Sequence, residues 1–553
     1  MVLGARLLLV MPRINSSSSN VIPNTTASTS NPSNVTDADS NHNLDAFNAN
    51  ASRPFDVYFT PNDDAYKFEM QCIDDVIAAR KADSTQYTHA DNPYKIQYMV
   101  YNLRNEKIVN KLFEAIKAGI DVQVLIESEQ ISDDRPWNKV DDWFEAEGLK
   151  VLRSDKDVDL AERKGAHLIG IDRRSLMHMK SRIFHYKDPD TGEKKSKVLS
   201  GSLNPGGYPV KNEENVNVMT SGRIARTYEK RFYEILEHKP ATNKWHDDRP
   251  INVMFTPYNQ GGPTTPTKKL FEWIDQEKEM ILVSVFALRN LTTKGDRENL
   301  VKKLKKAQDR GVKVMVITDR RKSDGVDVNG NPILMYGEPA HNDYTDENLE
   351  QAGIPVFELV NTKSEHSSVH GKSMVAGLKD MKVLTGAGNW TVAAMGSRKK
   401  NPRNEESFIF VESGKLDDNY TGRAYLSNFL GLLRKYDEQF PEKAESLIKE
   451  LQALPNWPKV PFDVSAFAKA HAGQEVYFVS DHPAVKSQTP HGAPGIRINT
   501  DPNAGSPPFA PQTPIKIPMG TKLSYRIATR DPSTGEIDFG DGPQITVVEE
   551  KKV

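Results

Sequence analysis

The chain has 553 residues, enough for several domains at about 150 residues each, which excludes a single small fold. Its 73 basic and 75 acidic side chains give a formal net charge of −2, which argues against a polycationic protein but allows a local basic cleft. The single cysteine, Cys72, excludes an intrachain disulfide framework and any multi-cysteine metal site. No apolar run reaches the ~18–20 residues that span a bilayer, so no transmembrane segment is expected.

The first 52 residues differ in composition from the rest of the chain. Residues 1–52 are rich in Ser, Thr and Asn and lack apolar periodicity over 15–36, so we expect a disordered leader. The opening stretch is apolar apart from Arg6, as in a short signal segment, although no clear cleavage site follows it. We therefore expect a secreted or periplasmic protein, with a cytoplasmic location as the alternative.

The middle of the chain, residues 53–450, contains an internal repeat. The run IQYMVYNLRN at residues 96–105 recurs as ILVSVFALRN at residues 281–290. Strand, helix, glycine and strand follow each other in both copies and make a βαβ unit. We therefore expect an α/β fold with two homologous α–β–α lobes, over residues 53–245 and 246–450. After each run, the helix, the glycine and the second strand are expected at 108–118, Gly119 and 122–126, and at 299–309, Gly311 and 314–317.

Each copy also carries a His-x-Lys pair. The pairs are His178 with Lys180 and His370 with Lys372, and the two histidines are 192 residues apart, like Gly119 and Gly311. Because residues two apart on a strand share a face, the imidazole and ammonium groups of each pair are expected to point into one site. A single His-x-Lys motif would be weak evidence of a site, but its repetition in both copies indicates function.

Further polar residues repeat downstream of each pair. GSLN at 201–204 corresponds to GAGN at 386–389, which adds Ser202, Asn204 and Asn389 to the candidate site. Glu214 and Glu406 are again 192 residues apart, and each follows its histidine by 36 residues. The repeated unit therefore includes a carboxylate as well as the cationic pair.

This set of residues resembles the phospholipase D superfamily, whose hallmark is a doubled H-x-K-x4-D followed by G-[SG]-x-N. The resemblance covers about residues 53–445 and implies two lobes around one active site, with no metal or other cofactor. The pattern departs at both aspartates, whose places are taken by His185 and Gly377. Asp188 and Asp380 lie three residues later and would substitute only if the strand ends shift.

The resemblance and the chemistry of the side chains together suggest roles. His178 is expected to attack phosphorus and form a phosphohistidine, and His370 to act as acid and base. The reverse assignment is the alternative, because the repeat is pseudo-symmetric. Glu214 and Glu406 would orient the imidazole nitrogens that do not react. The groups expected to hold the phosphoryl oxygens are Lys180, Lys372, Ser202, Asn204 and Asn389.

Other features near this set have two interpretations each. Trp390 could stack on a substrate or pack in the core, and the basic run 320–322 closes a strand and could border the site. The basic run 302–306 reads as a solvated helix face. His366 and His370 have the spacing of a helical zinc pair, but the local pattern is that of a strand, so we expect no metal site there.

The C-terminal part of the chain is expected to be a separate module. Residues 451–470 read as a linker and 471–553 as a small β-sandwich with short alternating strands. It is faintly similar to starch-binding-type or immunoglobulin-like modules but lacks the usual tryptophan platform. Carbohydrate binding would rest on other aromatic residues, and a spacer or adhesion role is the alternative. Those residues are Tyr477, Phe478, Tyr525 and Phe539.

Three functions are compatible with these features. The leading one is a phosphodiesterase that hydrolyses a phospholipid headgroup, or transfers the phosphatidyl group, at a membrane surface. A metal-independent nuclease ranks below the phospholipid enzyme, because proteins that bind nucleic acid are usually basic and this chain is not. The third is a non-catalytic phospholipid-binding protein, against which the presence of two histidines and two lysines argues.

Overall fold

The computed structural model describes residues 53–549 with the exception of 89–90, 173–174, 207–210, 259–263, 327–330, 333, 336–337, 340–343, 362–366, 436–442, 463, 465–474, 499–514 and 541. The predicted leader, residues 1–52, and His366 lie outside the described residues. Within the ranges described, no helix combines the length and apolar character needed to cross a bilayer.

The first lobe is built on one mixed sheet. Its strands are β1 (Phe55–Thr60), β2 (Lys95–Val100), β3 (Asp121–Glu127), β4 (Val151–Leu152), β5 (Leu168–Ile171), β6 (Lys180–Lys187), β7 (Lys194–Gly201) and β8 (Glu214–Met219). Its helices are α1 (Ala65–Ala82), α2 (Glu106–Lys117), α3 (Val140–Ala146), α4 (Leu160–Lys164) and α5 (Gly222–Leu236). The strand order is β1-β8-β7-β6-β2-β3-β5-β4.

The second lobe is built in the same way. Its sheet contains β9 (Ile251–Thr256), β10 (Met280–Val285), β11 (Lys313–Asp319), β14 (Val356–Leu359), β15 (Lys372–Ala376), β16 (Lys382–Gly386) and β17 (Glu406–Glu412), and β12 (Leu334–Met335) pairs separately with β13 (Glu338–Pro339). Its helices are α6 (Pro266–Gln276), α7 (Leu300–Asp309), α8 (Arg320–Ser323), α9 (Thr345–Gln351), α10 (Val392–Met395), α11 (Ser413–Asp417), α12 (Tyr420–Lys435) and α13 (Lys443–Gln452).

The strand orders of the two sheets confirm the expected duplication. The second sheet runs β9-β17-β16-β15-β10-β11-β14, which repeats the first strand by strand, except that β4 has no counterpart among the described residues of the second lobe. In both lobes the two strands of the βαβ unit, β2 with β3 and β10 with β11, pair in parallel. The Thr-Pro peptide bonds after β1 and β9 are both cis. Common topology explains why the sequence motifs recur at nearly constant offset.

Local sequence sets the boundaries of the repeated helices. The side chains of Asn105 and Asn299 accept hydrogen bonds from backbone N–H groups in the first turns of α2 and α7, as N-cap residues do. Gly119 and Gly311 follow these helices with φ of +83° and +92°, a conformation that only glycine adopts readily. The predicted helices and strands of the βαβ units are therefore confirmed, with the first strands ending at Val100 and Val285.

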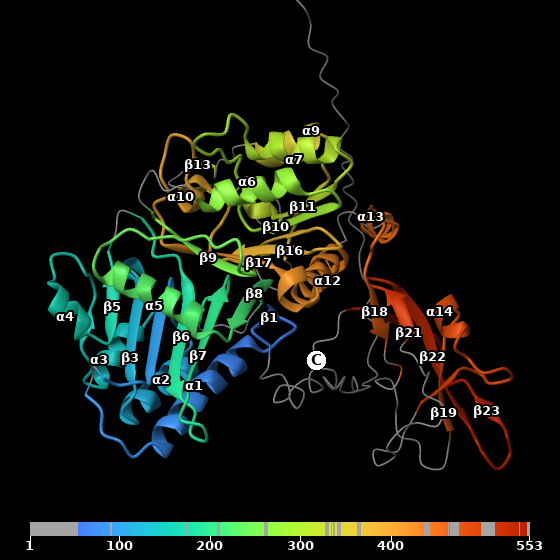
Figure 1. The fold of residues 1–553 in the computed structure, drawn as a ribbon, viewed down its shortest axis with the longest axis horizontal. Helices are drawn as coiled ribbons and strands as arrows, with labels where there is room; N and C mark the ends of the chain where they lie inside the picture. Colours follow the sequence, from blue (N-terminus) through green and yellow to red (C-terminus); the bar gives the residue numbers. More distant parts are fainter. Residues whose placement is uncertain are drawn as a thin grey trace, which may run out of the picture. The chain divides into compact units, whose positions relative to one another are not determined.

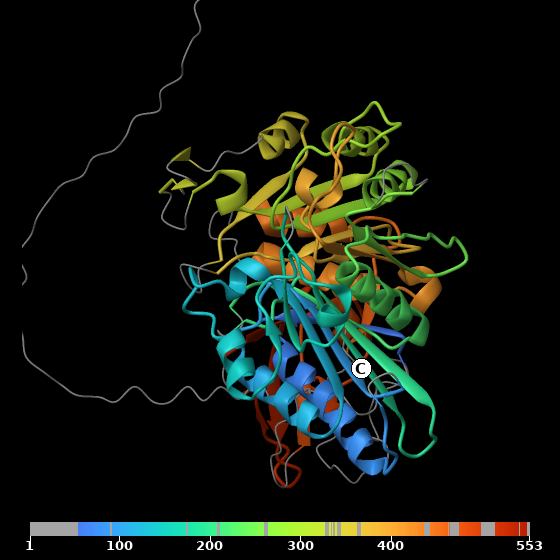
Figure 2. The ribbon, with the colours of Figure 1, turned by 90° about the vertical axis from the view of Figure 1, so that its left-hand side faces the viewer.

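Each lobe has helices on both faces of its sheet (Figures 1 and 2). In the first lobe α1 and α2 pack together on one face and α5 covers the other. In the second, α6 and α7 lie on one face and α12 on the other. Helix α5 of the first lobe also contacts β9 of the second, and helix α12 of the second lobe contacts β1 of the first. The expected α–β–α lobes are confirmed.

The C-terminal residues form two small sheets. β18 (Lys459–Phe462) pairs with β21 (Ile515–Pro518), and the second sheet contains β19 (Glu475–Val479), β20 (Ile496–Ile498), β22 (Lys522–Arg530), β23 (Ile537–Asp538) and β24 (Gln544–Val547), with α14 (Pro483–Lys486) beside them. β18 lies inside the range expected to be linker, because it supplies the partner strand of β21. Tyr477, Phe478 and Tyr525 are buried, so of the four aromatic residues considered for sugar binding only Phe539 is exposed.

Candidate active site

Each predicted histidine is held by the glutamate of the opposite lobe. Nδ1 of His178 lies 2.9 and 3.0 Å from the two carboxylate oxygens of Glu406. Nδ1 of His370 lies 2.8 Å from Oε2 of Glu214. Both glutamates are buried at the first residue of their strands, β17 and β8. The carboxylates therefore fix Nδ1–H on each ring and leave Nε2 for chemistry.

Backbone contacts bring the two half-sites together. Met177 forms a parallel bridge with Glu405, and Val369 forms the corresponding bridge with Glu213. Through these bridges the backbone N–H groups of His178 and His370 donate to the carbonyl oxygens of the residues just before the two glutamates, at 3.0 and 2.9 Å. The crosswise pairing follows from this register, because it sets each histidine beside the glutamate of the other lobe.

The lysines and an aromatic ring complete each half-site. Lys180 donates to the carbonyl oxygen of His178, and Lys372 donates to that of His370. The ring of Tyr101 packs edge-on against His178 with centroids 5.4 Å apart, and Phe286 does the same to His370 at 4.6 Å. Sequence reasoning missed these two aromatic residues, although they occupy matching places in the repeated runs 96–105 and 281–290.

A second missed pair of residues supports the segment that carries each histidine, just before β6 and β15. Glu127 and Asp319, the last residues of β3 and β11, accept hydrogen bonds from the backbone N–H groups of Met177 and Val369. They are also 192 residues apart, which is the offset of the histidines themselves. Burial raises the pKa of Glu127 to about 7. The repeated offset was the signal that could have identified them.

Burial dominates the electrostatics of the site. It lowers the pKa of His370 to about 4 and also lowers that of His178, while the paired glutamates oppose the shift. It lowers the pKa of Lys180 to about 8 and brings that of Lys372 well below its usual value. Burial acts to raise the pKa of Glu214, but His370 and Lys372 outweigh it, so the pKa is lowered. An anion beside these bases would stabilise their protonated forms and raise the pKa values that burial lowers.

The remaining predicted residues are one serine beside Glu214 and two half-buried asparagines. Ser202 is buried and its hydroxyl accepts from the backbone N–H of Asn215, next to Glu214. Asn204 and Asn389 are half-buried, and the side-chain oxygen of each is buried without a hydrogen-bond partner among the described residues. Asn212 and Asn404 donate to Glu214 and Glu406, at 3.1 and 3.2 Å. Buried side-chain oxygens without a hydrogen-bond partner, as in Asn204 and Asn389, are uncommon and are typical of a ligand-binding site.

The two residues that replace the aspartates of the motif lie far from the histidines. His185 lies in β6, seven residues after His178, which is roughly 20 Å at the rise of a strand, and its Nδ1 pairs with the hydroxyl of Ser196. Gly377 follows β15 with φ of +78° in the turn to β16. Neither position can reach the site.

The structure also corrects the idea that neighbouring aspartates substitute in the motif. Asp188 caps the turn between β6 and β7, where its carboxylate accepts from the backbone N–H groups of Asp190 and Thr191. Asp380 lies in the turn between β15 and β16. Both turns are at the ends of strands opposite to the histidines, so no shift of the strand ends brings these carboxylates into the site.

The ambiguous features are also resolved by their surroundings. Trp390 is 1% exposed and belongs to the core of the second lobe, so it is not a stacking platform. Nζ of Lys322 lies 5.4 Å from the ring centroid of Phe286, so the basic run 320–322 borders the second half-site. Lys305 and Lys306 form ion pairs on a helix face, as expected, whereas Lys303 is buried and pairs with Asp296.

One group of carboxylates is compact enough to hold a metal ion. Among the described residues, oxygen atoms of Asp324, Asp346 and Glu358 lie within 4.8 Å of one another. Burial raises the pKa of Glu358 to about 8, and the nearby acidic groups add to this. The group contains none of the histidines, lysines or glutamates of the candidate site.

Part of the second lobe is similar to a known family. Residues 270–423, which run from α6 into α12, match the family model described as cardiolipin synthase, PLD-like domain. No curated protein matches the chain.

The solved structures that resemble the chain do so weakly. Phosphatidylserine synthase from Haemophilus influenzae is 12% identical, with 72% of this chain and 92% of that one covered and a TM-score of 0.46. Yeast tyrosyl-DNA phosphodiesterase is 13% identical, with 66% and 91% covered and a TM-score of 0.38. Polyphosphate kinase from Porphyromonas gingivalis is 14% identical with a TM-score of 0.41; the match takes in 68% of this chain and spans 47% of the kinase's length.

Proposed function

We infer from the match of residues 270–423 to the phospholipase D-like domains, and from the duplicated topology, that the two lobes form one phosphodiesterase site. We propose that the protein cleaves the headgroup bond of a phospholipid, or transfers the phosphatidyl group to an alcohol, without a metal ion. The observation that carries the proposal is the crosswise pairing of His178 with Glu406 and of His370 with Glu214. Two imidazoles with fixed Nδ1–H groups suit a two-step displacement better than anion binding alone.

In the first step Nε2 of His178 attacks phosphorus and forms a P–N bond while the bond to the leaving oxygen breaks. His370, protonated, gives its proton to that oxygen, so the headgroup leaves as an alcohol. In the second step His370 takes a proton from water or an acceptor alcohol, whose oxygen forms the new P–O bond as the P–N bond breaks. Both histidines return to their starting states, and Lys180 and Lys372 offset the charge of the phosphoryl oxygens.

Binding of the substrate anion would favour the protonated form of His370 that the first step requires. Burial lowers the pKa of His370 to about 4, and the charge of Lys372 adds to that effect. A phosphodiester anion beside the ring and the lysine favours the imidazolium, which raises the pKa toward neutrality. The acid is therefore generated only when a phosphodiester is bound.

The experiment is a substrate panel in the presence of excess EDTA. Phosphatidylcholine, phosphatidylethanolamine, cardiolipin and single-stranded DNA are compared with the wild type, His178→Ala, His370→Ala and the matched control His185→Ala. We expect turnover of a phospholipid, a loss of at least ~10³-fold in the two site variants and a change within about threefold in the control. An alkaline quench with phosphorus-labelled substrate should trap phosphohistidine on His178.

Each outcome separates a part of the proposal. Cleavage of DNA alone would reject the phospholipid assignment while leaving the chemistry intact, and a trapped phosphohistidine on His370 would reverse the two roles. A loss below about tenfold in both site variants would reject the site. Binding of phospholipid without turnover, unchanged in His178→Ala, would indicate a protein that only binds lipid.

A further inference from the structure

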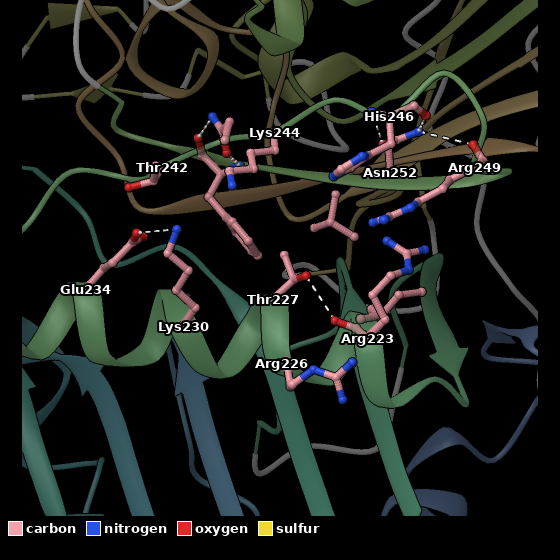
Figure 3. A pocket seen from close by; sticks show the side chains of 14 residues that line it. Arg223, Arg226, Thr227, Lys230, Glu234, Thr242, Lys244, His246, Arg249 and Asn252 are labelled. Carbon is pink, nitrogen blue, oxygen red and sulfur yellow. Dashed lines mark hydrogen bonds and ion pairs between the residues drawn. The ribbon is translucent and has the colours of Figure 1, made fainter.

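A cavity lies beside α5, and neither His178 nor His370 lines it (Figure 3). It has a volume of about 270 Å³ and lies between α5 and the segment 242–249 that leads into β9. None of the nine residues predicted for the candidate site lines it. Its walls therefore form a separate site on the protein.

The cavity is strongly cationic in a chain that is nearly neutral. Arg223, Arg226 and Lys230 line it from α5, and Lys244 and Arg249 line it from the facing segment. The carboxylate that lines it, Glu234, is already bonded to Lys230 and to Arg231 of the same helix. In the part of the chain that the structure describes, no carboxylate forms an ion pair with Arg223, Arg226, Lys244 or Arg249.

The guanidinium groups of Arg223 and Arg249 approach each other from opposite walls, as Figure 3 shows. Burial lowers the pKa of Arg223, and the charges of Arg249 and Arg226 lower it further, although Asp248 opposes them. Like charges in a half-buried position destabilise the folded chain. A cluster of this kind is typical of a binding site for an opposite charge rather than of a stabilising contact.

The walls of the cavity are fixed without a ligand. Asn252, which is buried, accepts from the backbone N–H of His246 and donates to the carbonyl oxygens of His246 and Arg249. Asn243 bonds both backbone groups of Phe255 at 2.8 Å, and Arg223 donates to the carbonyl oxygen of Ile251. The two arginines are thus held on rigid backbone, which reduces the entropy lost on binding.

We propose that this cavity binds a phosphate-type dianion, a phosphomonoester or pyrophosphate group, as a second anion site of the protein. Paired guanidinium groups present planar donors that match phosphoryl oxygens. The volume of about 270 Å³ is below the ~300–1,000 Å³ of sites for larger ligands, so it suits the charged group rather than a nucleotide. The group can belong to a free anion or to the headgroup of an anionic lipid, and the experiment separates these sources.

The test follows the thermal stability of the full chain with inorganic pyrophosphate and, separately, its sedimentation with vesicles. The vesicles are pure phosphatidylcholine or phosphatidylcholine with phosphatidic acid, which carries a phosphomonoester. The variant is Arg223→Gln with Arg249→Gln, and the control is Arg297→Gln with Arg526→Gln, which removes two exposed arginines elsewhere. A third protein, His178→Ala, weakens the candidate active site and leaves the cavity intact.

We expect the cavity variant to keep or raise the unfolding temperature without ligand, because a like-charge contact is removed. Its dissociation constant for pyrophosphate should rise at least tenfold, whereas the control and His178→Ala should stay within about twofold of the wild type. Binding should also weaken with added salt. Retention on vesicles with phosphatidic acid that is lost in the cavity variant identifies a lipid source, and pyrophosphate binding without retention identifies a free anion.

The proposal is overturned if pyrophosphate stabilises the cavity variant as much as the wild type, or if the stabilisation disappears in His178→Ala instead. The second result would assign all anion binding to the candidate active site. A lower unfolding temperature of the cavity variant without ligand, with unchanged pyrophosphate affinity, would show that the two arginines serve the fold. These outcomes do not depend on whether the protein hydrolyses a phosphodiester.

Discussion

The crosswise pairing predicts that Glu406→Gln perturbs His178 and leaves His370 unchanged. Glu406 is fully buried, and its two oxygens lie 2.9 and 3.0 Å from Nδ1 of the ring. Glutamine has the same shape and retains a hydrogen bond, so the substitution removes the charge with little change in packing. The matched variant is Glu214→Gln, which should perturb His370 alone.

The magnitude follows from the distance between the charges. At these contact distances the centres of an imidazolium and a carboxylate are about 4 Å apart, which gives about 4 kcal/mol at an effective dielectric constant of ~20. Without the carboxylate the pKa of His178, which burial already lowers, should fall further, because Glu406 opposes the effect of burial. If positive charge develops on His178 in the rate-limiting step, the rate should fall by up to ~10³-fold.

Two measurements check this prediction. Hydrolysis of the chromogenic diester bis(p-nitrophenyl) phosphate, followed against pH, gives the rate and the acidic limb of the profile. Nitrogen-15 NMR spectra of protein labelled at its 13 histidines report the protonation state of each ring. The variants His178→Ala and His370→Ala assign the two resonances of interest. We expect Glu406→Gln to move the His178 resonances and those of His370 to stay in place.

The opposite pattern would refute the reasoning. If Glu406→Gln moved His370, or if Glu214→Gln moved His178, each glutamate would serve the histidine of its own repeat. Unchanged resonances of both rings in both variants would mean that the carboxylates do not hold the imidazoles at all.

Two further predictions concern stability. The pKa of His370 is about 4 in the folded chain against an ordinary value of 6.5, so the unfolded chain binds more protons between these values and stability falls as pH falls from 6.5 to 4. The free energy of unfolding should fall by about 3 kcal/mol between pH 7 and pH 4 because of this group. Urea denaturation of His370→Gln should show a fall that is smaller by that amount. An equal fall in the wild type and the variant would contradict the burial of a neutral ring. Gly377→Asp, which restores the aspartate of the motif, should lower stability by about 1–3 kcal/mol, because φ is +78° there and a Cβ would lie 3.0 Å from the carbonyl oxygen of Asp380. Diester hydrolysis should stay within about threefold of wild type in Gly377→Asp and in the control His185→Asp, since both positions are far from the histidines; a tenfold gain in either would place the motif aspartate in the site.

The sequence determined the duplication and most of the candidate site. The repeat of strand, helix, glycine and strand depends on local rules, such as the caps Asn105 and Asn299 and the positive φ of Gly119 and Gly311. Because both copies follow the same rules, residues at matching positions of the repeat occupy equivalent places, at an offset of 192 for the histidines and 185 for Tyr101 and Phe286. That is why His178 and His370 could be found without a structure, and why Tyr101 and Phe286 were open to the same reasoning.

Only the tertiary structure decided which groups meet. The sequence places Glu214 36 residues after His178, but the bridge between Glu213 and Val369 sets it beside His370 instead. The cavity beside α5 was equally hidden, because Arg223 and Arg249 belong to a helix and a connecting segment with no shared motif. Pairing between lobes depends on register and burial across elements far apart in the chain, which no local pattern of residues encodes.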